Sequence, residues 1–356
     1  MREAVPRGYA AAVDGVAVFD RVDRCYFRVA GRAPGQMLKG VLTGTIPAPP
    51  EALAGGLERG TATYHAVLTP KGKMITDLWC WLAGDEAEEG FVLDVPQTGA
   101  EGLAAHLGKV LPPRFARMED ISRDAGAVTV AGAGAAEALA RLVGPALDEE
   151  DCAAALSRLG EGQYFRVPAP ATMAGTSAQP STATPRRAGA DPLLLMRTAD
   201  VWPPAFSVVG SAGAVSRLGD ALLEDGAVSA PADVWRTLRI EAGRPAFGED
   251  MDGTTIPVEA GIHTRAIDYE KGCYTGQEVI VRIRDRGHVN RELRLIELGD
   301  VEPPPSGTSL VRADEGDDAK PAGRVTSAVR SPRFGETIAL AYVRRGVDGP
   351  LRVVTG

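Results

Sequence analysis

Over its first 290 residues the chain alternates short β-prone runs with stretches of helical periodicity. The clearest feature is a predicted hairpin, in which the runs 63–68 and 74–82 are joined by a turn containing Pro70 and Gly72. Leucines then recur every four residues, which predicts a helix over 98–111. This alternation of strands and helices predicts an α+β fold.

Beyond Asn290 the pattern changes to short strands separated by turns rich in Pro, Gly and Asp. Five such strands without helices predict a small antiparallel barrel or sandwich. We therefore expect an α+β part over 1–290 and a β-barrel domain over 291–356. The strands are predicted at 293–298, 308–311, 323–329, 337–343 and 351–354.

One internal segment interrupts the α+β part. Residues 168–192 are rich in Pro, Ala, Ser, Thr and Gly, and Met173 is their one large apolar side chain. Such a composition cannot bury enough apolar surface to offset the entropy of ordering. We therefore predict a flexible insertion there.

Composition narrows the class of protein. The net charge of −8 gives no support for broad nucleic-acid binding. The four cysteines form no CxxC pair, and the four histidines form no HxxxH or HExxH array, which argues against a disulfide framework or a metal site. No apolar run approaches the roughly 18 residues of a membrane span. The N-terminal residues lack the apolar core of a signal peptide, so we expect a cytoplasmic protein with no membrane partner.

Two carboxylates stand at unusual positions. Asp77 is the one acid inside the second hairpin strand, on the face of Trp79. It is either a partly buried group that meets a donor or a cavity, or a solvated residue at an edge. Glu241 falls in the last turn of a helix predicted at 232–242, where the helix dipole disfavours negative charge. We therefore expect Glu241 to have a partner.

A lone cysteine stands in the stretch KGCYTGQE, residues 271–278. Beside Lys271, on a glycine-flanked turn, its thiol would ionise more readily than an ordinary one; a buried, inert cysteine is the alternative. Residues 279–288 alternate apolar side chains with charges, which predicts a strand carrying Arg282 and two further arginines on one face. That face is either solvated or part of a cleft for an anion.

The stretch 271–278 followed by Arg282 resembles the signature of the YgfZ family of folate-binding proteins. That family is similar to the aminomethyltransferase (T-protein) of the glycine cleavage system. The segments 68–73, 239–243 and 322–327 agree with it in order and spacing, so the resemblance covers nearly the whole chain outside the insertion.

The resemblance implies a three-domain, GcvT-like ring with a central channel for tetrahydrofolate and a C-terminal antiparallel β-barrel. It also implies a role in the assembly or maintenance of iron–sulfur enzymes, including radical enzymes that modify tRNA, as transient partners. Cys273 would be the reactive thiol, and Glu241 would stand where T-proteins carry a pterin-binding acid. The other motif residues would frame Cys273 and help to bind the cofactor: Lys271, Gly276, Gln277, Glu278 and Arg282.

Two departures from T-proteins bear on function. Thr76 precedes Asp77 where T-proteins have two adjacent acids, and Gly44 stands where they have asparagine. Three hypotheses follow: an accessory protein for iron–sulfur enzymes acting through Cys273, a tetrahydrofolate-dependent aminomethyltransferase or demethylase using Asp77, and a non-catalytic folate sensor that depends on Glu241. A single cysteine cannot supply the ligands of a permanently bound cluster.

Overall fold

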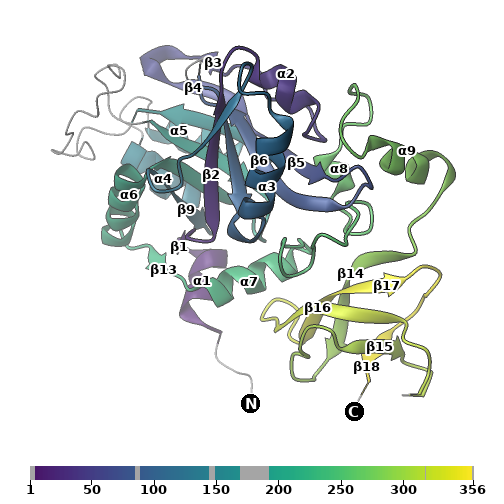
Figure 1. Cartoon of the computed structure of the whole chain (residues 1–356). Coiled ribbons are helices and arrows are strands. Elements are labelled where there is room, and N and C mark those ends of the chain that lie inside the picture. Colours follow the sequence, from purple (N-terminus) through teal and green to yellow (C-terminus); the bar gives the residue numbers. More distant parts are fainter. Residues whose placement is uncertain (1–4, 85–88, 144–148, 169–191, 317, 355–356) are drawn as a thin grey trace.

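A computed structural model gives the arrangement of the chain (Figure 1). Residues 169–191, which make up most of the predicted insertion, lie outside the described residues. Within the described part, no helix has both the length and the apolar character needed to cross a bilayer. The structure describes residues 5–84, 89–143, 149–168, 192–316 and 318–354.

The first of two large sheets has eight strands drawn from distant parts of the chain. All its neighbouring strands are antiparallel except the outer pair formed by residues 228–229 and 17–20, which is parallel. In spatial order they are β13 (Val228–Ser229), β1 (Ala17–Asp20), β9 (Ala125–Ala131), β12 (Ala205–Ser211), β11 (Leu193–Thr198), β10 (Gln163–Val167), β4 (Glu58–Thr61) and β3 (Glu51–Ala52).

The second sheet is a five-stranded antiparallel one that contains the predicted hairpin. The hairpin prediction is confirmed, since its two runs are rich in β-branched and aromatic residues and pair directly. In spatial order the strands are β5 (Thr63–Leu68), β6 (Met74–Leu82), β7 (Phe91–Pro96), β2 (Arg24–Ala30) and β8 (Arg117–Asp120).

Helices cover the outer faces of both sheets, while the inner faces pack against each other. Tyr26 and Trp79 of the second sheet share one buried cluster with Leu194 and Met196 of the first. The helices are α1 (Arg7–Asp14), α2 (Pro34–Lys39), α3 (Gln97–Val110), α4 (Ala135–Val143), α5 (Glu149–Ser157), α6 (Ala212–Glu224), α7 (Ala232–Glu241), α8 (His263–Ala266) and α9 (Gln277–Arg286), with a short 3-10 turn at Ala54–Gly56. Of these, α3 lies on β6 and β7, and α6 lies on β9 and β12.

The C-terminal strands form a curled antiparallel sheet, which appears in Figure 1 as a separate lobe below the α+β body. All five predicted strands are present. The lobe contacts the body through Ile240 of α7, which packs with Val329, Ile338 and Leu340. The strands, in spatial order, are β14 (Arg291–Gly299), β17 (Thr337–Arg344), β16 (Gly323–Arg330), β15 (Ser309–Arg312) and β18 (Leu351–Val353).

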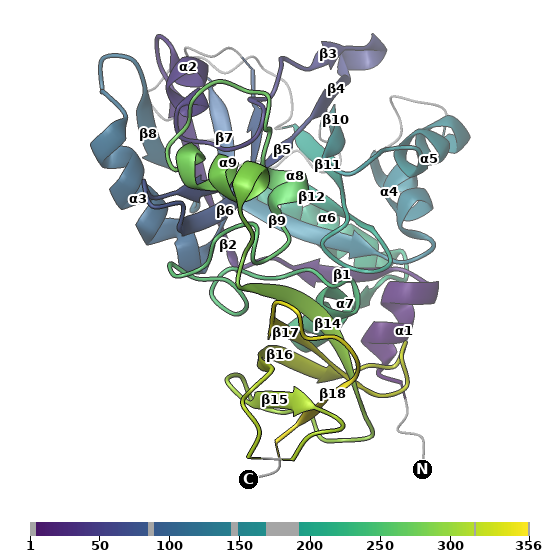
Figure 2. The same cartoon turned by 90° about the vertical axis from the view of Figure 1, so that its right-hand side faces the viewer.

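The predicted strand over 279–288 is wrong, because these residues form helix α9. Figure 2 shows α9 at the front of the α+β body, above the C-terminal lobe. Its β-branched residues favour a strand only weakly. Helical spacing buries Ile280 and brings Glu278 within 2.7 Å of Arg282, a pair four residues apart.

Candidate functional site

A row of aromatic and acidic side chains crosses the inner face of the five-stranded sheet. The strand register places Tyr64 opposite Trp79, Trp79 opposite Asp94, and Asp94 opposite Tyr26. Directly opposed residues project to the same face, and so does a residue two positions along a strand. Asp77 therefore joins this row, which we call the inner cluster: Tyr26, Tyr64, Asp77, Trp79 and Asp94.

Asp77 is a buried carboxyl group with one bonded and one open oxygen. Its side chain is on an inner strand, which excludes the solvated edge position, and it accepts a hydrogen bond of 2.5 Å from the Tyr64 hydroxyl. Its Oδ1 atom has no partner among the described residues. Burial raises the pKa of Asp77, although Tyr64 and Arg24 oppose the shift. The carboxyl group thus has a free acceptor atom and holds a proton more readily than an exposed one.

The neighbouring Thr76 faces the other way, onto helix α3. Its Oγ1 lies so close to Gly99 that a Cβ atom on that glycine would be 2.0 Å away. A second acid at position 76 would therefore lie beneath α3, not in the inner cluster. Of the two positions where the resemblance to T-proteins implies adjacent acids, only 77 reaches the inner face.

Two groups of ion pairs flank the cluster. Arg24 binds Asp94 at 2.7 Å, and Arg265 binds both Asp200, at 2.9 Å, and Glu161. Burial raises the pKa of Asp94 despite its arginine. Burial would also raise the pKa of Asp200, but the Arg265 guanidinium outweighs it and lowers that pKa to about 2. The site thus combines two carboxyl groups of raised pKa with one of lowered pKa.

A narrow cavity of about 20 Å³ lies between the two sheets, enough for about one water molecule. Its walls come from both sheets and from the segment after β11. They include Arg24, Trp79, Asp94, Met196, Thr198 and Asp200.

The stretch 271–276 forms a surface loop that is tied to the body by its lysine. The Lys271 ammonium group donates to the carbonyl oxygens of Leu42 and Gly44, at 2.6 and 2.8 Å. Burial lowers the pKa of Lys271 to about 8. Cys273, two residues after Lys271 in this loop, is exposed, so the alternative of a buried, inert thiol is wrong.

The same loop rests on the turn of the β5–β6 hairpin. Gly276 adopts a left-handed backbone with φ of +84°, and a Cβ atom there would lie 2.7 Å from the Thr69 carbonyl oxygen. On the hairpin side of the same contact, a Cβ atom on Gly72 of the turn would lie 2.9 Å from the side chain of Val279. Two motifs about 200 residues apart in the sequence are thus in direct contact.

The remaining motif residues lie at the start of α9. Gln277 is half-buried, and its backbone N–H donates to the Tyr274 carbonyl. Glu278 and Arg282 pair with each other at the surface, with side chains 84% and 70% exposed. In the described part of the chain, no hydrogen bond or ion pair joins any of these three to the inner cluster, so their role in cofactor binding stays a prediction.

Glu241 has the partners that its position predicts, and they are protein groups. One carboxylate oxygen accepts from the Tyr9 hydroxyl at 2.8 Å, and the other accepts from the Ser331 hydroxyl and the Arg333 backbone N–H. The side chain is 3% exposed and ties α1, α7 and the C-terminal lobe together. Its predicted role toward a pterin is untested by this geometry.

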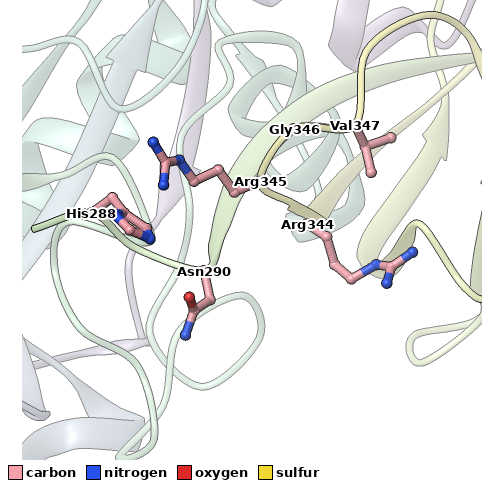
Figure 3. A pocket seen from close by; sticks show the side chains of 6 residues that line it. All are labelled: His288, Asn290, Arg344, Arg345, Gly346 and Val347. Carbon is pink, nitrogen blue, oxygen red and sulfur yellow. The ribbon is translucent and has the colours of Figure 1, made fainter.

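The structure also has an open basic depression of about 660 Å³ between the end of β17 and the segment before β14. Figure 3 shows Arg345 on the side of His288, whereas Arg344 extends away from both. The cationic groups do not converge on one point. The depression therefore gives no geometry for holding a single small anion.

Sequence reasoning singled out Asp77 and Cys273, whose functional roles stay predictions, but it missed most residues of the inner site. Arg24, Asp94, Asp200 and Arg265 come from four separate segments, and none belongs to a recognisable motif. The available signal was weak: single charges next to or within strongly apolar strands, such as Asp94 in β7.

Comparisons with known proteins agree with this architecture. Residues 291–353 match the family described as the glycine cleavage T-protein C-terminal barrel domain. The crystal structure of the glycine cleavage system aminomethyltransferase T from Bartonella henselae superposes with a TM-score of 0.70 at 18% identity, over 95% of this chain and 81% of that one. The chain therefore has the aminomethyltransferase-like fold, complete with its C-terminal barrel domain.

Sequence relatives point to the same superfamily. An aminomethyltransferase from Corynebacterium jeikeium is 25% identical over 94% of this chain and 80% of its own length. The tRNA-modifying protein YgfZ from Serratia proteamaculans is 33% identical, over 35% of this chain and 38% of its own length. The chain thus belongs to the aminomethyltransferase-like superfamily, and its place in the YgfZ family stays a prediction.

Proposed function

We propose that the protein binds tetrahydrofolate between its two large sheets and acts through Cys273 as an accessory protein for iron–sulfur enzymes. The observation that carries the proposal is the open Oδ1 atom of Asp77, a buried acceptor that has no partner among the described residues. A pterin ring offers N–H donors to such an acceptor and a flat face to aromatic residues. Tyr64 and Trp79, whose ring centroids are 5.3 Å apart, supply such a surface.

The chemistry of the inner cluster suits a pterin, but its present volume does not. Asp77 and the Tyr26 hydroxyl, which has no partner within the described segments, would bind polar edges, and Trp79 would contact the ring. Bound tetrahydrofolate would supply a carrier for a one-carbon unit. The cavity of about 20 Å³ must widen before a bicyclic ring enters.

Cys273 supports the accessory role by its position. The loop is fixed by Lys271 and Gly276, so the exposed thiol is presented at a defined place without being enclosed. Such a thiol is accessible to a partner protein and can serve as a transient ligand or nucleophile. The iron–sulfur role itself comes from the motif resemblance.

The test combines binding and complementation. Calorimetric titration with tetrahydrofolate should give binding to the wild type that is weakened in Asp77→Asn. Cys273→Ala should keep both the fold and the folate affinity, yet fail to support tRNA methylthiolation in cells that lack the native protein. Absence of folate binding, or full complementation by Cys273→Ala, would overturn the proposal.

A folate-dependent one-carbon transferase is the second candidate. It is favoured by the geometry of Asp77, whose pKa is raised by burial and which reaches the inner face where Thr76 does not. Here Asp77 would hold or release a proton next to the Tyr64 hydroxyl. Turnover of an aminomethyl or N-methyl donor should then fall at least a hundredfold in Asp77→Asn and stay unchanged in Cys273→Ala. No turnover with a broad panel of donors would contradict it.

A further inference from the structure

The Arg265 guanidinium, itself a flat group, lies over the aromatic rings of Tyr64 and Trp79. Its guanidinium carbon lies 4.6 Å from the ring centroid of Tyr64 and 5.8 Å from that of Trp79. Its terminal nitrogen donates to Asp200 at 2.9 Å and to Glu161. One planar cation thus lies over the aromatic pair of the inner cluster and is held at its edge by two carboxylates.

The guanidinium group is not fully satisfied there. Its Nε atom is buried and has no hydrogen-bond partner among the described residues. The Arg265 side chain is 13% exposed, while Asp200 and Glu161 are 33% and 30% exposed. The two carboxylates are therefore accessible to solvent, whereas the Arg265 side chain lies mostly in the interior between them and the aromatic pair.

Only the side chain has to move to open this place. Arg265 belongs to the short helix α8, whose last residue, Ala266, accepts a hydrogen bond of 2.6 Å from Thr43. Asp268, two residues after Ala266, donates its backbone N–H to the Thr43 carbonyl. These contacts hold the backbone in place, so a ligand would have to displace only the arginine side chain.

A guanidinium group and the amidine edge of a 2-amino-4-oxopyrimidine ring are chemically alike. Both present coplanar N–H donors around one carbon, both bind carboxylates through parallel hydrogen bonds, and both stack on aromatic faces. A carboxylate pair that binds one will bind the other when the neighbouring space allows it.

We propose that Asp200 and Glu161 are the acceptors for the amidine edge of the ligand ring, and that Arg265 holds their place until the ligand displaces it. The arginine is then a specificity-determining residue, because a ring without N–H donors at that edge cannot replace its hydrogen bonds. This inference rests on the proposed function for the ligand's identity, but the acceptor pair can be tested without folate.

The first measurement uses tetrahydrofolate and calorimetry. Arg265→Ala removes the internal competitor, so the affinity should increase by about tenfold or more, the value of a charge-assisted hydrogen bond. Asp200→Asn in the same background should reverse the gain. Arg239→Ala, which removes a buried arginine paired with Asp250 elsewhere in the fold, should leave the affinity unchanged.

The second measurement uses the guanidinium ion itself. At millimolar concentration it should stabilise Arg265→Ala against heat and compete with tetrahydrofolate, and it should do neither in the wild type or in Arg265→Ala combined with Asp200→Asn. Sodium chloride at equal ionic strength is the control. Should Arg265→Ala not fold, Arg265→Gln gives the same comparison.

The outcomes separate the two proposals. If the wild type binds folate, equal or weaker binding by Arg265→Ala would overturn the acceptor pair. The absence of a guanidinium effect that depends on Asp200 would overturn it in either case. Guanidinium binding that depends on Asp200, together with no folate binding by any variant, would support the acceptor pair and overturn the proposed function.

Discussion

Replacing Gly276 by alanine tests how firmly the cysteine loop is seated on the hairpin. Gly276 has a φ of +84°, a conformation that residues with a side chain rarely adopt. A Cβ atom would also lie 2.7 Å from the Thr69 carbonyl oxygen and 3.0 Å from the Leu68 side chain. The first is backbone of a tight turn and the second belongs to a fully buried residue, so neither can shift cheaply.

The magnitude follows from these two effects. The left-handed conformation costs about 1–2 kcal/mol for a residue with a Cβ atom. Forcing an extra methyl group into a packed contact adds about 1–3 kcal/mol. We therefore expect Gly276→Ala to lower the free energy of unfolding by about 2–5 kcal/mol, a large part of the stability of an ordinary domain.

Two other glycines of the chain separate the contributions. Gly261 has a φ of +72° but open space around its Cβ position, so Gly261→Ala should cost only the backbone part, about 1–2 kcal/mol. Gly272, next to Cys273, has open space and no left-handed backbone. Gly272→Ala should therefore change stability by less than about 0.5 kcal/mol.

Urea denaturation followed by tryptophan fluorescence gives the three free energies. The reaction rate of Cys273 with a thiol reagent reports on the loop itself and should rise in Gly276→Ala, because the loop is lifted from the hairpin. If Gly276→Ala costs no more than Gly261→Ala, the contact with the hairpin does not constrain the loop, and the reasoning is refuted.

Three further predictions follow from the site. Asp200, with a pKa of about 2 against an ordinary 3.8, contributes stability that is present above pH 4 and lost as the pH falls toward 2. Because the side chain is partly exposed, the loss should be about 1–2 kcal/mol in urea titrations, and Asp200→Asn should not show it; the same acid loss in both proteins would contradict the Arg265 pairing. Native thiol titration should label Cys273 before the buried Cys80 and Cys152, and Cys273→Ala should lose the fast phase; a fast phase that persists would place the reactive thiol elsewhere. Glu241→Gln should lower the free energy of unfolding by about 1–3 kcal/mol, because the Tyr9 hydroxyl and two other donors lose a charged acceptor; a variant that keeps its stability but loses folate affinity would assign Glu241 to the ligand instead.

The sequence predicted the elements whose signals are local. The hairpin follows from β-prone runs around a turn with Pro70 and Gly72, and the five C-terminal strands follow from turns spaced along a helix-free segment. The same local reasoning failed at α9, because alternating charges and β-branched residues favour a strand. Burial of Ile280 against the body outweighs that preference and selects the helix.

What the sequence by itself determined is the fold class and the two chemical candidates, Asp77 and Cys273, because an acid inside an apolar strand and a cysteine within a long motif are visible without coordinates. Only the tertiary structure decided their surroundings. In the tertiary structure Asp77 points toward Tyr64, and Thr76 points the other way. Cys273 is exposed on a loop that rests on the hairpin. The physical reason is that strand register and packing between distant segments set burial and hydrogen bonding, and no local pattern encodes which segments meet.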